Sequence, residues 1–112
     1  MLTMSTLHKE VGLLERILQE CEDDYVGLWS IYRQVKEAGY SDPSLCTMAL
    51  LHFLLSAGVL EAGIADDQGN FHPWSTSSGD AYLRIVGEWS RLGREPDVGD
   101  IVWFTTPVPT KW

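Results

Sequence analysis

The stretch from Asp42 to Gly58 is apolar around most of the circumference that it would have as a helix. Asp42 suits the N-cap, and Pro43 suits the first helical position, where the missing N–H of proline costs nothing. Gly58 suits the C-terminal end, because glycine adopts left-handed backbone angles without strain. A helix that is apolar on nearly every side must be covered on nearly every side. We therefore expect residues 42–58 to form the most buried helix, around which the other elements pack.

Two helices are predicted before this one. From Leu7 to Cys21, apolar residues recur at helical spacing and charged residues occupy the opposite side. A second helix is predicted from about Tyr25 to Ala38, with Asp24 as its N-cap and Gly39 at its end. Each would bury one face against residues 42–58.

After Gly58 the pattern changes to that of short strands. Residues 59–65 and 71–74 predict two strands, and residues 66–70 between them have the composition of a hairpin turn. Pro73 has no backbone N–H, which places its strand at a sheet edge or ends the strand there.

A fourth helix and a last strand are predicted beyond the hairpin. The segment Ser77–Asp80 resembles a capping box at the start of a helix, and Gly93 suits its end. Residues 101–105 then predict a strand. The fold class is therefore α/β (α+β) and winged-helix-like: three helices, a β-hairpin, a fourth helix, and a C-terminal strand that completes a small antiparallel sheet. At 112 residues we expect one domain, 1–112.

The charge of the chain limits its partners. Sixteen Asp and Glu oppose eight Lys and Arg, which gives a net charge of −8. Such a field repels nucleic acid and anionic lipid surfaces and attracts basic proteins. No Lys or Arg lies between Lys36 and Arg84, the stretch that would hold the recognition helix and wing of a DNA-binding protein. We expect neither nucleic-acid nor membrane binding. Two interpretations of the charge stay open: plain solubility, or attraction of a basic partner.

No pattern in the chain indicates catalysis, a metal site or a cofactor. His8, His52 and His72 are far apart and have no metal-ligand spacing. Cys21 and Cys46 fall on apolar helical positions, which predicts buried, reduced thiols. We expect no enzyme and no cofactor.

The compartment follows from two further segments. Residues 1–10 lack the basic start and apolar run of a signal peptide. The longest apolar run, residues 48–55, is too short to span a bilayer. We expect a cytoplasmic protein.

Five tryptophans are many for this length. Trp29 and Trp89 fall on apolar helix faces, which predicts core positions. Trp103 lies on a strand between two other apolar residues, so one set faces the helices and the other faces outward. Trp74 follows Pro73 in the hairpin. Exposed aromatic rings mark protein interfaces, and the alternative is that these rings pack the sheet against the fourth helix.

Two segments of the chain carry a resemblance. They are residues 54–63, L-L-S-A-G-V-L-E-A-G, and residues 89–104, W-S-R-L-G-R-E-P-D-V-G-D-I-V-W-F. Together they resemble a group of small, uncharacterised bacterial proteins with the same order of elements. By size and charge the chain is also similar to the immunity proteins of contact-dependent growth-inhibition systems. That resemblance implies a protein that binds and neutralises a toxin domain, often a basic nuclease, inside the cell.

The expected function is therefore non-enzymatic binding of a basic protein partner, such as a toxin domain. The alternative is a winged-helix, transcription-associated module that dimerises and binds DNA weakly or through a partner. Whether the acidic clusters share one face is open, as is the oligomeric state. The expected partner-binding residues are Glu22, Asp23, Asp24, Asp66, Asp67 and Trp74.

Overall fold

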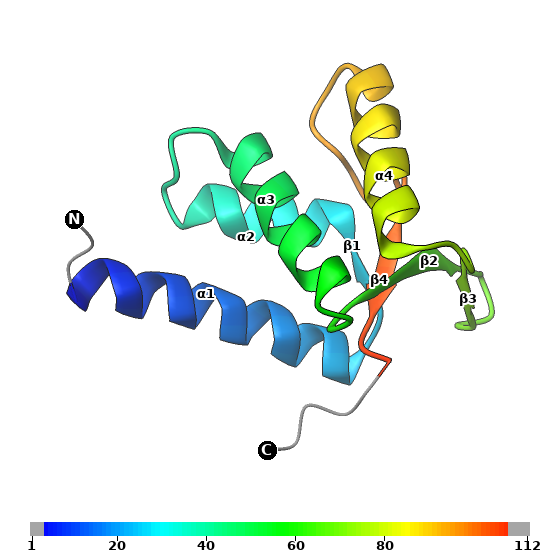
Figure 1. The fold of residues 1–112 in the computed structure, drawn as a ribbon, viewed down its shortest axis with the longest axis horizontal. Coiled ribbons are helices and arrows are strands. Elements are labelled where there is room, and N and C mark those ends of the chain that lie inside the picture. Colours follow the sequence, from blue (N-terminus) through cyan, green and yellow to red (C-terminus); the bar gives the residue numbers. More distant parts are fainter. Residues whose placement is uncertain (1–3, 108–112) are drawn as a thin grey trace.

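The computed structural model describes residues 4–107 of the chain, with side chains from Glu10 onward, as four helices and a four-stranded sheet (Figure 1). The elements in chain order are α1 (Met4–Asp23), β1 (Val26–Gly27), α2 (Leu28–Glu37), α3 (Pro43–Ser56), β2 (Glu61–Ala65), β3 (Phe71–Pro73), α4 (Ser78–Leu92) and β4 (Trp103–Thr105). The mixed α+β class is as predicted. Within residues 4–107, no helix combines the length and the apolar content that crossing a membrane requires.

The sheet is antiparallel, with the strand order β1-β4-β2-β3. Strands β2 and β3 form the predicted hairpin, and β3, which contains Pro73, lies at an edge as expected. The C-terminal strand β4 lies between β1 and β2, so that Phe104 pairs with Val26 on one side and with Ala62 on the other. The last strand therefore joins the hairpin to the segment between the first two helices.

Local signals placed two helices correctly. The Asp42 carboxylate accepts the backbone N–H of Leu45 at 3.1 Å, which makes Asp42 the N-cap of α3. The Ser77 hydroxyl accepts the backbone N–H of Asp80 at 3.1 Å and caps α4. Gly93 ends α4 with a φ of 70°, in the left-handed region.

The start of the second helix was predicted wrongly. Helix α2 begins at Leu28, and its N-cap is Gly27 rather than Asp24. Residues 26 and 27 instead pair with β4, so they are extended and cannot belong to a helix. The carboxylate of Asp24 accepts the N–H of Tyr25 at 2.7 Å, in the bend between α1 and β1.

The prediction that residues 42–58 form the most buried helix was also wrong. Five of the ten residues of α2 are buried, against four of the fourteen of α3. Helix α3 buries Leu51 and Leu54 between α2 and α4, but Leu45 is 63% exposed and Phe53 is 62% exposed. The helices cover α3 on one side only, which leaves part of its apolar surface facing solvent.

One face of the sheet closes the core. Val26, Ala62, Val102 and Phe104 are buried there. Leu60, just before β2, and the apolar faces of α1, α2, α3 and α4 contribute the rest of this core. The buried hydrophobic residues of the helices are Leu13, Ile17, Cys21, Leu28, Ile31, Tyr32, Val35, Leu51, Leu54, Leu55, Ala81, Ile85 and Trp89.

Candidate functional site

The first acidic cluster lies at the end of α1. The helix continues two residues beyond the predicted end at Cys21, so Glu22 and Asp23 occupy its last turn and Asp24 follows it. All three side chains are exposed. The C-terminal end of a helix carries a partial negative charge, and the last turn of α1 holds no basic residue to offset it. The end of α1 is therefore a site of concentrated negative potential.

The second cluster lies in the β2–β3 turn, where its two carboxylates differ. One oxygen of Asp66 accepts the N–H groups of Gln68 and Asn70, each at 2.9 Å, and the other lies 2.7 Å from Nε2 of His72. These hydrogen bonds, that of His72 first, lower the pKa of Asp66 to about 2. Asp67 is exposed in the same turn. Asp66 thus holds the turn together while Asp67 adds charge at its surface.

Trp74 lies on the helix side of the sheet. Its ring packs against the core, and the guanidinium carbon of Arg84 on α4 is 3.8 Å from the ring centroid. Its backbone N–H donates to the carbonyl of Ala62 at 3.1 Å. The ring is half-buried, and Arg84 covers one of its faces.

A row of paired residues crosses the middle of the sheet. Gly27 of β1 lies opposite Trp103 of β4, and Trp103 lies opposite Gly63 of β2. Side chains alternate along a strand, so Trp103 points away from the core that buries Val102 and Phe104. The sequence had indicated this alternation without deciding which set faces outward.

The glycines beside Trp103 make room for further aromatic rings. A Cβ on Gly27 would lie 2.7 Å from the ring of Trp29, and a Cβ on Gly63 would lie 2.8 Å from Cζ of Phe71. The ring of Phe71 in turn packs on Tyr25, with centroids 5.2 Å apart. All of these rings are half-buried, and none is among the residues packed against the core. We call Tyr25, Trp29, Phe71 and Trp103 the aromatic sheet face.

Both acidic clusters border this aromatic sheet face. Asp24 directly precedes Tyr25, and Asp67 lies in the turn that leads into Phe71. The contact between Tyr25 and Phe71 brings together the segments that follow the two clusters. In Figure 1 both segments lie in the half of the molecule away from the start of α1.

Trp29 was predicted as a core residue, and the structure corrects this. Its ring is half-buried, and the guanidinium carbon of Arg33 lies 4.7 Å from the ring centroid. Trp29 lies in the first turn of α2, directly after the extended residues 26 and 27, whose pairing with β4 no local pattern indicates. Trp89, the other predicted core tryptophan, is 7% exposed as expected.

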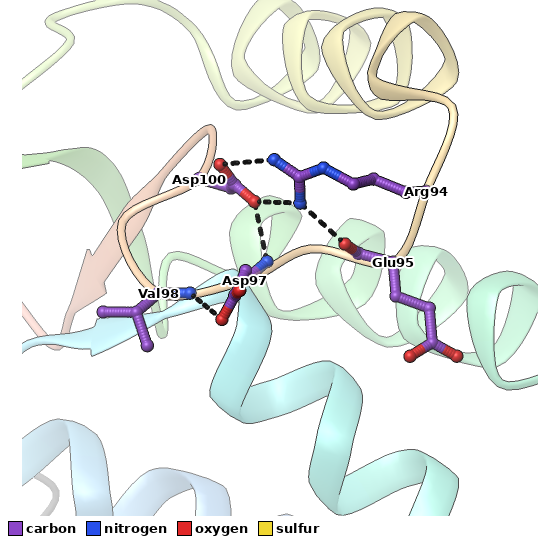
Figure 2. Close-up of polar contacts among 5 residues, drawn as sticks. All are labelled: Arg94, Glu95, Asp97, Val98 and Asp100. Carbon is purple, nitrogen blue, oxygen red and sulfur yellow. Dashed lines mark hydrogen bonds and ion pairs between the residues drawn. The ribbon is translucent and has the colours of Figure 1, made fainter.

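The loop after α4 is held beside Trp29 by ionic contacts. Figure 2 shows Arg94 bound to Asp100, with the shortest distance 2.7 Å, and Asp100 also accepting the N–H of Asp97. Glu95 accepts from the Tyr32 hydroxyl at 3.0 Å and from Lys36 at 2.7 Å. Between this loop and α2 is a hollow of about 490 Å³ that has Trp29 in its wall. The loop thus forms a fixed flank of the aromatic sheet face.

The chemically reactive side chains that are described are spread out. His52 stacks on Tyr82 at 4.7 Å, and His72 contacts Asp66, while the side chain of His8 is outside the described ones. Burial raises the pKa of Cys21 to about 12, so it stays a thiol. Cys46 is only half-buried, contrary to the prediction.

From residue 10 to residue 107, no three His, Cys, Asp or Glu side chains gather as metal ligands would. Comparisons with models of protein families, with curated proteins and with solved structures found no match to this chain.

Proposed function

We propose that this chain is a non-enzymatic, cytoplasmic protein-binding domain whose partner is a basic protein. The contact between Tyr25 and Phe71, at 5.2 Å, carries the proposal because it joins two acidic clusters to one half-exposed aromatic surface. Protein interfaces combine central aromatic rings with a polar border. An acidic border steers a basic partner toward the rings and repels an acidic one.

We further propose that the partner is a toxin domain of the nuclease type, as the similarity to immunity proteins suggests. A nuclease carries a basic active surface because it must bind phosphates. An acidic domain docked on that surface occupies the place of the nucleic acid substrate. The exposed carboxylates of Glu22, Asp23 and Asp67 would contact the toxin's cations, and Trp103 would supply the central ring.

We also propose that the chain has a winged-helix-like arrangement that binds a protein rather than DNA. Helices α1, α2 and α3 precede the β2–β3 hairpin, which corresponds to a wing, and β4 adds a strand beside it. In DNA-binding members the third helix enters the major groove. Residues 37–83 contain α3 and the hairpin but no Lys or Arg, which favours protein over DNA as the partner.

In the test, the partner is first captured from the native host, identified and purified. It is then cross-linked to this chain with a carbodiimide, which joins carboxylates to lysines without a spacer. We expect cross-links from residues 22–24 and from Asp67. Association rates are then measured at low and high salt for two variants, Glu22→Gln/Asp23→Asn/Asp24→Asn and Asp67→Asn. The amides remove the negative charge and keep the size of the side chain and one acceptor oxygen, while the second oxygen becomes an NH2 donor.

Both variants should associate more slowly at low salt, by ~10-fold, and the difference should shrink at high salt. Glu37→Gln is the matched control, because Glu37 is exposed at the end of α2 and outside both clusters. Trp103→Ala should instead speed dissociation by ~30-fold, as expected for a central interface residue. An acidic partner, or equal effects of the control and the cluster variants, would contradict the proposal.

A further inference from the structure

Helix α3 has an apolar stripe on its outer side. Leu45, Ala49 and Phe53 follow each other at intervals of four residues, so they lie in line on one face. All three are exposed, Leu45 by 63% and Phe53 by 62%. We call these residues the α3 stripe.

An apolar groove of about 380 Å³ runs beside the α3 stripe, between α3 and α1. Ala49 belongs to both the stripe and the groove. The groove is also lined by Leu13, Leu14, Val35, Tyr40, Cys46 and Leu50. Glu10 stands at its wall as the one charged side chain among the lining residues. The stripe and the groove together form a continuous apolar surface on this side of the molecule.

Helix α3 is also without charge. Its fourteen residues include no Asp, Glu, Lys or Arg, whereas the chain as a whole has a net charge of −8. A helix face that stays in water normally carries charged residues, so an uncharged, exposed face indicates a surface that is covered. A basic partner finds no charge complement on α3. Two acidic copies of this chain, in contrast, repel each other least where neither carries a carboxylate.

We propose that α3 mediates a symmetric dimer of this chain. The two α3 helices would pack antiparallel about a twofold axis near Ala49, whose small side chain permits close approach of the helices. In this arrangement Phe53 of each copy lies near Leu45 of the other, and its ring can enter the apolar groove. The pairing is self-complementary because each copy offers the same stripe and the same groove. This dimer stands independently of the proposed binding of a basic protein.

The test is sedimentation equilibrium of the full chain over a range of concentration and salt. We expect a monomer–dimer equilibrium that shifts toward dimer as salt rises, because salt screens the repulsion between two acidic copies. Ala49→Glu and Phe53→Glu should each raise the dimer dissociation constant by ~100-fold or more. Ala49→Glu brings two carboxylates together at the twofold axis, and Phe53→Glu places an unpaired carboxylate against the apolar Leu45 of the other copy. Leu83→Glu is the matched control: Leu83 is 67% exposed on α4, outside the stripe, and should leave the constant unchanged.

Disulfide trapping provides a second measurement that does not depend on destabilising a variant. In a Cys46→Ser background, Ala49→Cys should form an intermolecular disulfide under mild oxidation, because residues on a twofold axis face their own copies. Leu83→Cys in the same background should not. A chain that stays monomeric up to its solubility limit would overturn the dimer. So would a dimer that Leu83→Glu weakens as much as the α3 variants do, or trapping through Leu83→Cys alone.

Discussion

Asp66 closes the β2–β3 turn with its own carboxylate. Two backbone N–H groups and the ring of His72 contact it, and these contacts lower its pKa from an ordinary value of 3.8 to about 2. Such a carboxylate stabilises the fold only while it is ionised. Its contribution is therefore complete above the unfolded pKa of 3.8 and is lost as the pH falls toward 2.

The first prediction concerns this turn. Asp66→Asn should weaken the pH dependence of the unfolding free energy between about pH 4 and pH 2, because no carboxylate is left to protonate at that position. Asp67→Asn removes the same charge one residue along but keeps the three contacts of Asp66, so it should retain the wild-type dependence. Thermal unfolding followed by circular dichroism from pH 5 to pH 2 measures both. Parallel curves for wild type and Asp66→Asn would contradict the assignment.

Leu51 is the subject of the second prediction, because it is fully buried between α3 and its neighbours. Leu51→Ala should lower the free energy of unfolding by about 2–5 kcal/mol through the cavity it leaves. Leu83→Ala makes the same chemical change at a site 67% exposed, where about 0.5 kcal/mol or less is expected. Urea denaturation compares the two, and equal losses would show that Leu51 does not support the core.

At the scale of elements, boundaries set by neighbouring residues could be predicted and boundaries set by distant ones could not. The caps Asp42 and Ser77 act over three residues, so the sequence around them is sufficient. Strand β1 exists because Val26 pairs with Phe104, far along the chain. Nothing near Val26 indicates this partner, and the local pattern favoured a helix starting at Tyr25.

The third prediction contrasts a glycine in a strand with one in a helix. A Cβ on Gly63 would lie 2.8 Å from both Phe71 and the Cα of Pro73, so β2 and β3 would have to move apart. Gly63→Ala should cost about 1–3 kcal/mol of unfolding free energy. At Gly87 in α4 a Cβ meets only the flexible end of Arg91, at 3.5 Å. Gly87→Ala should therefore stabilise the protein by about 0.5–1 kcal/mol. Chemical denaturation gives both values, and the same sign for both would contradict this account.

For the whole molecule, composition predicts the sign of the charge but not its arrangement. The clusters at residues 22–24 and at Asp67 are far apart in sequence, and the contact of Tyr25 with Phe71 brings together the segments that follow them. The exposure of α3 likewise depends on how the elements pack in space. Its apolar pattern predicted burial, but a chain of this size supplies helices to cover only one side of it. Predicting either surface requires the packing of the sheet and helices.

The last prediction follows from the distribution of cations over the whole chain. Duplex DNA binding draws its non-specific affinity, with dissociation constants of ~10⁻⁴ to 10⁻⁶ M, from Lys and Arg placed against phosphates. Residues 37–83 contain neither, and they include α3, β2 and β3. Several of the remaining cations are engaged with acidic groups or rings: Lys36 with Glu95, Arg94 with Asp100, and Arg84 with Trp74.

We expect no binding of a fluorescent duplex at physiological salt, measured by anisotropy. Lowering the salt should not bring binding into range, because the net charge of −8 repels the duplex more strongly as screening weakens. A complex that forms with one sequence and not with its scrambled control would favour the transcription-associated alternative.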